Sequence, residues 1–428
     1  MSPSDRLHDG SITSPVGFSA GSASAGMHPD GAHDVALLLS ETACSGAGVF
    51  TQNRIRAAPV VYDDALLAER PGRLRGIVMN SQIANACTGD EGGEAAAAMA
   101  RAAETALGLP SRCMLVLSTG VIGTPIPIED VSNAIRGATE TMDPEGGIAA
   151  AKAIMTTDRT AKHVAVRVET PAGVVTVGGV AKGSTMIHPN MATMLGVITT
   201  DAAIDAARLS ALLGPVADRT FNAITVDGDT SPNDSVIMLA NGASEVSIAR
   251  DAEAWKLFEA AVELVARDLA LMIVRDGQGA HRLVEFTVNG AGTEAMARSI
   301  GRAIASSVLV KTGWAGGDSD WGSIFSAAGA SGFAVEPDRL RLQVQVRADT
   351  GGPEGEWLLL AERGAGVQVD PLETRRIFSA PAVAFRLDLG MGGGEATIWT
   401  CDLTEEYIRS NEGGHHAKGG LGTGRGRH

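Results

Sequence analysis

Residues 182–201 read K-G-S-T-M-I-H-P-N-M-A-T-M-L-G-V-I-T-T-D. A polar approach with Gly and Pro leads to Ala192 and Thr193, and the apolar run from Met194 to Ile198 predicts a short buried strand. A hydroxyl at the head of a buried strand is well placed to act as a nucleophile. Threonine is a weak nucleophile, but an N-terminal threonine has its own α-amine beside it as a base. The alternative is that Thr193 only caps or lines a strand.

The string H-P-N-M-A-T-M-L at residues 188–195 closely resembles the self-cleaving segment of the ornithine acetyltransferase family, the bifunctional glutamate N-acetyltransferases of arginine biosynthesis. The resemblance implies that the bond between Ala192 and Thr193 breaks autocatalytically and that the new terminal Thr193 carries the acyl group. It predicts an α chain of residues 1–192 and a β chain of residues 193–428.

The same resemblance implies a fold of the mixed α/β class. We expect a layered α/β/β/α sandwich formed by two intertwined chains derived from one precursor. The αβ pair is expected to dimerise into an α2β2 heterotetramer. Further family strings extend from N-R-I-R-A-A-P at residues 53–59 to T-C-D-L-T-E-E-Y at residues 400–407, so the resemblance covers nearly the whole chain.

The string S-T-G-V-I-G at residues 118–123 follows an apolar segment that predicts a strand. A glycine after a strand can present backbone N–H groups to a ligand, and an oxyanion needs such donors. By itself the string is also consistent with a plain turn. The resemblance assigns the Thr119 side chain and the Gly120 backbone N–H to an oxyanion hole.

The resemblance also implies contacts with the substrate, in addition to Thr193. Thr156, from a T-T-D string, is given this role, and Lys182 supplies a cation for a carboxylate substrate, although it could be an ordinary surface lysine. Asn411 aligns with a substrate-binding Asn. The resemblance also places Gln278 and His416 among the substrate-binding residues, but these two depart from the family pattern. Gln278 stands where Glu is usual, and His416 stands where Thr is usual.

These residues predict a ping-pong acyltransferase that moves acetyl from N2-acetylornithine to glutamate through acetyl-Thr193, with acetyl-CoA open as a further acyl donor. His188 is an alternative base, but the terminal amine makes it unnecessary and a structural role is favoured. Since Gln278 and His416 depart from the pattern, a second hypothesis is a paralogue, acyltransferase or amidohydrolase, that acts on a different acylated amine. A third is a binding protein with a degraded site.

The composition limits which fold, partners and cellular location these hypotheses allow. With 44% hydrophobic but only 4% aromatic residues, the core must be built from Ala, Val, Ile and Leu. The net charge of −15 argues against nucleic acid or an anionic membrane as main partner. The four cysteines form no C-x-x-C pair, so a zinc site and disulfides are not expected. Without a signal peptide or a spanning apolar run, we expect a cytoplasmic protein that needs no metal and no cofactor.

Local patterns predict elements of both classes. Residues 1–34 read as a loose arm, and residues 412–428 as a flexible Gly-rich tail. Helices are expected at residues 91–107, 204–213, 215–222 and 252–275. Short strands are expected at residues 35–39, 48–51, 59–62 and 308–312, with a β-rich end at residues 340–401.

Overall fold

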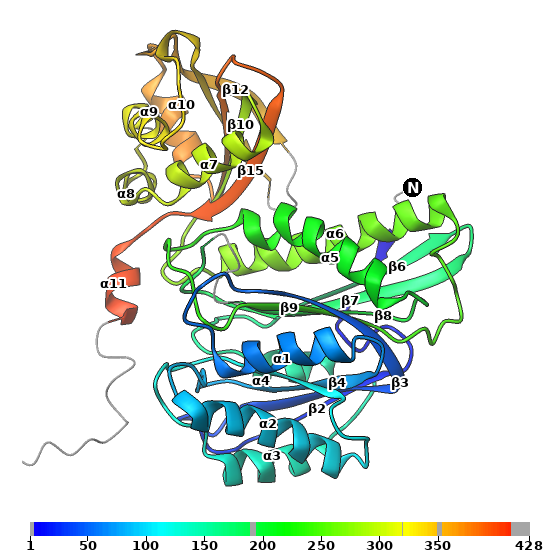
Figure 1. Ribbon diagram of the computed structural model, residues 1–428. Helices are drawn as coiled ribbons and strands as arrows, with labels where there is room; N and C mark the ends of the chain where they lie inside the picture. Colours follow the sequence, from blue (N-terminus) through cyan, green and yellow to red (C-terminus); the bar gives the residue numbers. More distant parts are fainter. Residues whose placement is uncertain (1–3, 189–193, 319, 349–352, 412–428) are drawn as a thin grey trace, which may run out of the picture.

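The computed structural model describes residues 4–188, 194–318, 320–348 and 353–411. The bond between Ala192 and Thr193 lies outside the described residues, as do His416 and the predicted tail. The described residues form helices and strands, and the strands are arranged in two mixed sheets. The predicted mixed α/β class is therefore confirmed (Figure 1). In these ranges no helix has both the length and the apolar character needed to cross a membrane.

The larger sheet occupies the first part of the chain. Its strands are β1 (Ser4–Arg6), β2 (Phe18–Ala23), β3 (Val35–Phe50), β4 (Leu74–Asn80), β5 (Met114–Ser118), β6 (Lys162–Thr170), β7 (Gly173–Lys182), β8 (Leu195–Thr200) and β9 (Ser235–Ala240). Their order is β1-β6-β7-β8-β9-β3-β4-β5, and β2 also pairs with β3. Strand β3 joins two halves: residues 35–40 pair with β2, residues 45–50 pair with β9, and its pairing with β4 is irregular between them.

The two halves of this sheet face each other across an apolar core to which Leu38, Leu117, Val197 and Leu239 contribute. Helices α5 (Ala206–Arg219) and α6 (Ala252–Arg275) cover the outer face of the half that contains β6 to β9. Helices α2 (Gly89–Ala106) and α3 (Ile128–Glu140) cover the outer face of the other half. Helices α1 (Ala58–Glu69) and α4 (Gly147–Ala153) contribute to the core between the halves. The result is the predicted α/β/β/α sandwich (Figure 1).

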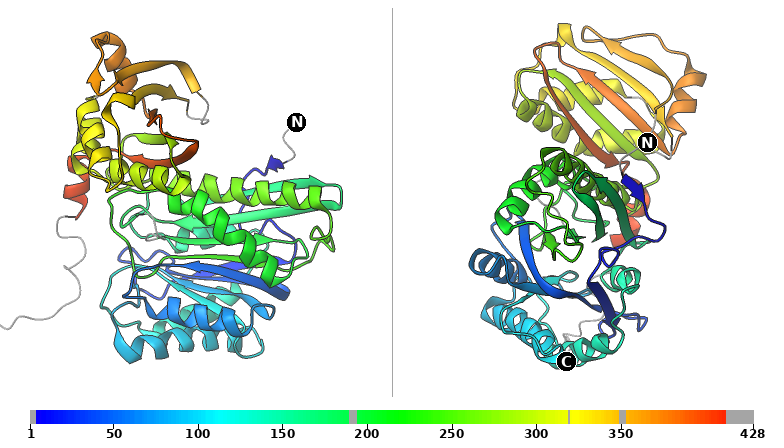
Figure 2. Two further views of the ribbon diagram at one scale, coloured as in Figure 1. Left: turned by 45° about the horizontal axis from the view of Figure 1, so that its top comes forward. Right: turned by 90° about the vertical axis from the view of Figure 1, so that its right-hand side faces the viewer.

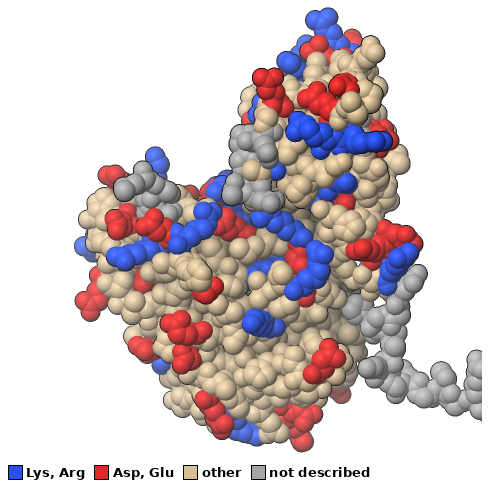
Figure 3. Space-filling view, turned by 180° about the vertical axis from the view of Figure 1, so that it is seen from behind, with Lys and Arg blue, Asp and Glu red and all other residues tan. Residues whose placement is uncertain are grey.

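A second sheet with its own core follows and lies over the α5–α6 end of the sandwich (Figure 2). Its strands are β10 (Leu283–Ala291), β11 (Arg341–Arg347), β12 (Pro353–Glu362), β13 (Ala365–Gly366), β14 (Ala382–Asp388) and β15 (Gly394–Cys401). Their order is β13-β12-β11-β14-β10-β15. The remaining helices are α7 (Glu294–Ala305), α8 (Val308–Gly316), α9 (Trp321–Gly329), α10 (Pro371–Phe378), α11 (Glu405–Asn411) and the 3-10 turns η1 (Phe221–Ala223) and η2 (Pro337–Arg339). On the face opposite to that of Figure 1, cationic and anionic side chains are interspersed (Figure 3).

The strand order interleaves the two parts of the chain on either side of the predicted scissile bond. Strands β7 and β8 are antiparallel neighbours, with Lys182 opposite Leu195, and their connection contains that bond. Strands β8 and β9 lie between β7 on one side and β3 on the other, both of which precede the bond. A break at this connection would therefore leave both products in one sheet, as expected for intertwined chains.

Two predicted strands are helical. Residues 59–62 lie in the first turn of α1, where a proline is tolerated because the N–H that it lacks would have no helical partner. Residues 308–312 begin α8, whose N-terminus is capped when the Ser307 side chain accepts a hydrogen bond from the Val310 N–H. A short apolar run does not distinguish a strand from a buried helical turn, and for this reason both segments were wrongly predicted to be strands.

Two further predictions are wrong. Residues 1–34 were predicted to be a loose arm, but the described part, residues 4–34, is held in the sheet, because β1 pairs with β6 and β2 pairs with β3. The two helices expected at residues 204–213 and 215–222 are one helix, α5, which continues through Pro215 to Arg219. Proline ends a helix by removing one hydrogen bond and crowding one carbonyl, but packing of the apolar face of α5 overrides this preference.

Candidate active site

Lys182 is the last residue of β7, and its side chain is buried, with 3% of the residue exposed. Its Nζ donates hydrogen bonds to the hydroxyl oxygens of Thr119 at 3.0 Å and of Thr156 at 2.7 Å. Thr119 directly follows β5, and Thr156 follows α4, so three predicted site residues meet from three parts of the chain. The alternative of an ordinary surface lysine is wrong.

Asp158 provides the negative charge beneath Lys182. Its Oδ2 lies 3.9 Å from the Lys182 Nζ, while its Oδ1 accepts from the Lys162 Nζ at 2.6 Å and from the Gly183 N–H at 2.7 Å. Burial alone would raise the pKa of Asp158, but the charges of Lys182 and Lys162 outweigh it and lower that pKa to about 2. Burial lowers the pKa of Lys182, and the Asp158 charge opposes this effect.

The charged group continues away from the site through Lys162. The Lys162 Nζ also donates to Asp276 at 2.6 Å, and Arg159 donates to the other oxygen of Asp276 at 3.1 Å. Asp276 ends α6, so this chain of alternating charges joins α6 to the segment that carries Thr156. We did not predict Asp158, Lys162 or Asp276. Asp158 is the last residue of the T-T-D string, and Asp276 begins the string D-G-Q-G-A at residues 276–280, which contains Gln278.

The backbone at Gly120 requires glycine. Its φ is +135°, and a Cβ there would lie 2.0 Å from the carbonyl carbon of Gln82. The Thr119 N–H donates to the Asn80 carbonyl at 3.1 Å, whereas no hydrogen bond within the described ranges uses the Gly120 N–H. Since the Thr119 oxygen accepts from Lys182, its hydroxyl hydrogen is available for another acceptor. The segment thus offers two donors, as an oxyanion hole requires.

The chain is anchored directly after the predicted nucleophile. The Met194 N–H donates to Asp234 Oδ1 at 3.2 Å, and the Met194 carbonyl accepts from the Ser235 N–H at 3.1 Å. Asp234 is fully buried, and burial raises the pKa of its carboxyl well above the usual value. Thr193 itself lies outside the described residues.

The chain is also anchored before that segment. Asp227 accepts from the N–H groups of Met186 at 2.6 Å and of Ile187 at 2.9 Å, and from the Tyr407 hydroxyl at 3.2 Å. The last contact brings α11 to this segment. Asp227 begins the string D-G-D-T-S-P-N-D at residues 227–234, and Tyr407 ends the string T-C-D-L-T-E-E-Y at residues 400–407. We had predicted no role for either residue.

His188 lies between two hydroxyl groups. Its Nδ1 is 3.2 Å from the Thr225 hydroxyl oxygen and 3.3 Å from that of Ser306. Burial lowers the pKa of His188, so its neutral form is favoured. These contacts are consistent with the structural role that we favoured.

Gln278 lies against the turn that follows Lys182. Its N–H donates to the Ser184 carbonyl at 2.9 Å, while its side-chain Oε1 is buried and has no hydrogen-bond partner among the described residues. Asn411 ends α11, is exposed, and donates to the Tyr407 carbonyl at 2.7 Å. No described hydrogen bond joins Asn411 to Lys182, Thr119 or Thr156. No described hydrogen bond joins Gln278 to these three residues either, but its backbone bonds to Ser184, two residues after Lys182, whereas Asn411 bonds within its own helix.

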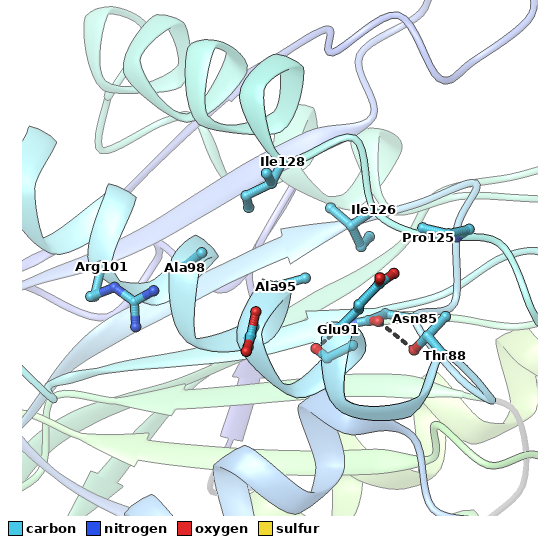
Figure 4. Close-up of a pocket in the computed structure, with 11 residues that line it drawn as sticks. Asn85, Thr88, Glu91, Ala95, Ala98, Arg101, Pro125, Ile126 and Ile128 are labelled. Atoms are coloured by element: carbon cyan, nitrogen blue, oxygen red, sulfur yellow. Dashed lines mark hydrogen bonds between the residues drawn. The ribbon is translucent and has the colours of Figure 1, made fainter.

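A cavity of about 340 Å³ lies elsewhere, beside α2 (Figure 4). Its described lining includes Asn85, Glu91, Arg101 and Ile126 and none of the predicted site residues. Asn85 is held there by the Thr88 hydroxyl, which donates to its Oδ1 at 2.8 Å. The cavity is thus separate from the Lys182 cluster.

Comparisons with known proteins extend over most of the chain. The model of the ArgJ family matches residues 19–413. The "Arginine biosynthesis bifunctional protein ArgJ" of Symbiobacterium thermophilum is 46% identical over 405 residues, which cover 94% of this chain and 98% of that protein. The protein of the same name from Thermotoga neapolitana is 44% identical over 380 residues, covering 88% and 94%. The solved ornithine acetyltransferase of Mycobacterium tuberculosis, complexed with ornithine, is 38% identical and covers 44% of this chain and 98% of that chain, with a TM-score of 0.40.

Proposed function

The chain belongs to the ArgJ family, and from that premise we propose that it transfers an acetyl group from N2-acetylornithine to glutamate through an ester on Thr193. The observation that carries the proposal is the buried Lys182, which holds Thr119 beside Gly120. Lys182 is opposite Leu195 in the sheet, so these donors lie at the end of the sheet where β8 begins. Thr193 precedes β8 by two positions.

The first step of the proposal is cleavage between Ala192 and Thr193. It frees the Thr193 α-amine, which then serves as the base for the adjacent hydroxyl. Because β8 and β9 lie between strands that precede the bond, the sheet can hold both products together after the cut.

In the acylation step the α-amine of Thr193 takes the hydroxyl proton, and the hydroxyl oxygen attacks the acetyl carbonyl carbon of N2-acetylornithine. The tetrahedral oxyanion accepts hydrogen bonds from the Thr119 hydroxyl and the Gly120 N–H. The carbon–nitrogen bond breaks, and the amine of ornithine leaves with the proton from the Thr193 ammonium. The positive charge of Lys182, next to Thr119, strengthens that donor.

In the second half-reaction the amine of glutamate attacks the carbonyl carbon of the Thr193 ester. The same two donors stabilise the second oxyanion. The Thr193 α-amine takes the proton that the glutamate amine loses and returns it to the Thr193 oxygen as the carbon–oxygen bond breaks. Acetyl-CoA is proposed as a further donor to the same hydroxyl, with free thiol as its product. Thiol release that depends on Thr193 measures this activity.

The direct test is mass spectrometry of the purified protein, followed by N-terminal sequencing. The expected products are residues 1–192 and 193–428, and the second begins Thr-Met-Leu. Steady-state assays should show acetyl transfer from N2-acetylornithine to glutamate, lost in Thr193→Ala. A chain that stays intact, or a Thr193→Ala variant with wild-type turnover, contradicts the proposal. Native mass spectrometry tests the proposed α2β2 assembly.

One observation favours a second candidate, in which the same ester forms from a different acylated amine. The buried Oε1 of Gln278 has no described partner, and it is a neutral acceptor for a substrate ammonium. Assays with a panel of acylated amines and amino acids, with and without glutamate, separate the two candidates. Turnover of N2-acetylornithine far above all other donors excludes the second.

A further inference from the structure

Two adjacent buried residues, Asn233 and Asp234, contact different parts of the proposed active site. The Asn233 side-chain amide donates to the Ser118 carbonyl at 2.9 Å and to the Ala84 carbonyl at 2.5 Å. The Asp234 Oδ1 accepts from the Met194 N–H at 3.2 Å. Both residues directly precede β9 and are at most 4% exposed.

The Asn233 amide fastens the segment that carries the oxyanion donors. Ser118 directly precedes Thr119 and Gly120, so a bond to its carbonyl acts one residue from the donors. Ala84 lies on the neighbouring segment, where its N–H donates to the Val121 carbonyl at 3.0 Å. One side chain thus bonds both segments at the turn that contains Gly120.

The Asp234 carboxyl fastens the chain that begins with the predicted nucleophile. Met194 directly follows Thr193, so a bond to its N–H acts one residue from the attacking hydroxyl. The second oxygen, Oδ2, is buried and has no hydrogen-bond partner in the described ranges. Burial raises the pKa of Asp234, and the nearby Thr51 hydroxyl partly opposes this effect. That hydroxyl donates its hydrogen to the Ser231 carbonyl at 2.7 Å and not to Oδ2.

We propose that Asn233 and Asp234 are positioning residues that together set the distance between the oxyanion donors and the Thr193 hydroxyl. The inference rests on the proposed function, because it takes Thr193 as the nucleophile. The two side chains leave adjacent backbone positions at the start of β9, which is paired with β8 and β3. Because the two residues are consecutive, the covalent backbone fixes the spacing of the points where their side chains begin, and the pairing of β9 holds this point of the chain in the sheet.

The geometry matters because acyl transfer is sensitive to small displacements. A misplacement of about 1 Å between reacting groups can cost roughly 10²-fold in rate. Loss of either side chain would free one segment relative to the other while leaving every reacting group in the protein. The predicted signature is a fall in kcat with little change in KM, since no substrate contact is removed.

The test compares Asn233→Ala, Asp234→Ala and Asp234→Asn with a matched control, Asp201→Ala. Asp201 lies at the opposite end of β8, is buried, accepts backbone N–H bonds from Thr176 at 2.8 Å and Val16 at 3.1 Å, and has a pKa that burial raises. It therefore reproduces the buried carboxyl and its backbone bonds away from the site. Asn241→Ala, at the far end of β9, is the control for Asn233.

Self-cleavage, the rate of acyl-enzyme formation, kcat, KM and the thermal midpoint are measured for each variant. Both alanine variants should lower kcat by about 10²-fold, with KM within a few fold of wild type. Asp234→Asn keeps a carbonyl oxygen for the Met194 N–H, so it should recover most of the loss. The Asp201→Ala control should share the loss in thermal midpoint, and both controls should keep kcat.

The inference is overturned if both alanine variants keep kcat within about threefold of their controls, or if Asp234→Asn is as slow as Asp234→Ala. If the Asp234→Ala chain does not fold, Asp234→Asn and Asn233→Ala decide. Slow turnover in Asn233→Ala with normal self-cleavage supports the inference, and wild-type turnover in that variant contradicts it. Failure of the proposed function looks different, because wild type would then lack transferase activity or Thr193→Ala would retain it.

Discussion

The ammonium group of Lys182 lies 3.0 Å from the hydroxyl oxygen of Thr119 and is buried with it. Because the Lys182 ammonium has only donors, the Thr119 oxygen must be the acceptor. The hydrogen of the Thr119 hydroxyl is then available to an acceptor other than Lys182. The cation that we predicted to bind a substrate carboxylate thus contacts the side chain that we propose as an oxyanion donor. It is held in a position where Asp158 balances its charge.

The first prediction concerns the hydroxyl of Thr119. Thr119→Val keeps the shape of the side chain but removes the donor, and it should lower kcat by about 10²- to 10³-fold. Thr119→Ser keeps the hydroxyl and should remain within about tenfold of wild type. Acyl-enzyme formation, followed by rapid quench and mass spectrometry, measures the effect. Equal rates for Thr119→Val and wild type would show that this hydroxyl does not contact the oxyanion.

The second prediction concerns the charge of Lys182. In Lys182→Met the new side chain has a similar length but no charge. Thr119 then loses the donor that orients its hydroxyl, and Lys162 remains as the only lysine beside Asp158. We expect kcat to fall by about 10²-fold or more, because the oxyanion donor is no longer oriented. Lys152→Met, at an exposed position of α4, is the control for the loss of one lysine. An active Lys182→Met enzyme with only a raised KM would limit Lys182 to substrate binding.

The third prediction is a loss of stability in acid that Asp158 causes. Its pKa is lowered in the folded chain from 3.8 to about 2. A lowered carboxyl pKa stabilises the fold above the unfolded value, and the stabilisation disappears as the pH falls through the folded value. Its size is about 2 kcal/mol at neutral pH, by the conversion of one pKa unit to 1.36 kcal/mol.

Urea unfolding of wild type and Asp158→Asn between pH 5 and pH 2 measures this contribution. The difference in free energy of unfolding should shrink as the pH falls from about 4 to about 2, where the wild-type carboxyl becomes neutral too. A difference that stays constant over this window would mean that the pKa of Asp158 is the same in the folded and the unfolded chain.

Particular strings explain how much of the site could be predicted. The S-T-G string alone was consistent with a plain turn, and the family resemblance assigned Thr119 and Gly120 to an oxyanion hole. The structure adds that Gly120 has φ +135°, where a Cβ would clash with the Gln82 backbone, but no sequence pattern shows that geometry. The charge network was missed because Asp158 and Asp276 are far apart in the sequence and meet only through the fold at Lys162. Asn233 and Asp234 end the string D-G-D-T-S-P-N-D at residues 227–234. Only the folded structure shows that their side chains bond to Ser118 and Met194.

The fold shows the same limit. The layered α/β/β/α sandwich followed from the family resemblance, whereas local patterns alone indicated only a mixture of helices and strands. Residues 59–62 and 308–312 were assigned to strands because short apolar runs have no decisive period. In both cases a local cap or a proline in the first turn favours a helix, and the surrounding core selects it.

The fourth prediction concerns the backbone at Gly120. Gly120→Ala would place a Cβ 2.0 Å from the Gln82 carbonyl carbon at a φ that side chains rarely adopt. The turn must then open, which moves the N–H away from the oxyanion, so kcat should fall by about 10²-fold or more. Gly123→Ala is the control, because φ there is also positive but no atom lies within 4 Å of its added Cβ. Similar activity of the two variants would exclude the Gly120 N–H from the mechanism.

The last prediction concerns Gln278, whose buried Oε1 has no described partner beside the turn that follows Lys182. Hydrogen bonds to charged groups contribute about 1.5–3 kcal/mol, against about 1 kcal/mol for neutral pairs. If the amide faces the substrate ammonium, Gln278→Glu should therefore lower KM for N2-acetylornithine by about tenfold. Gln278→Leu should raise it, and kcat should change little in both. If the wild-type substrate is a different acylated amine, Gln278→Glu should instead weaken its turnover, because a buried carboxylate without a cation is costly. The change in KM for N2-acetylornithine, compared with the change in turnover of the other acylated amines in wild type and Gln278→Glu, therefore decides which donor the site was built to hold.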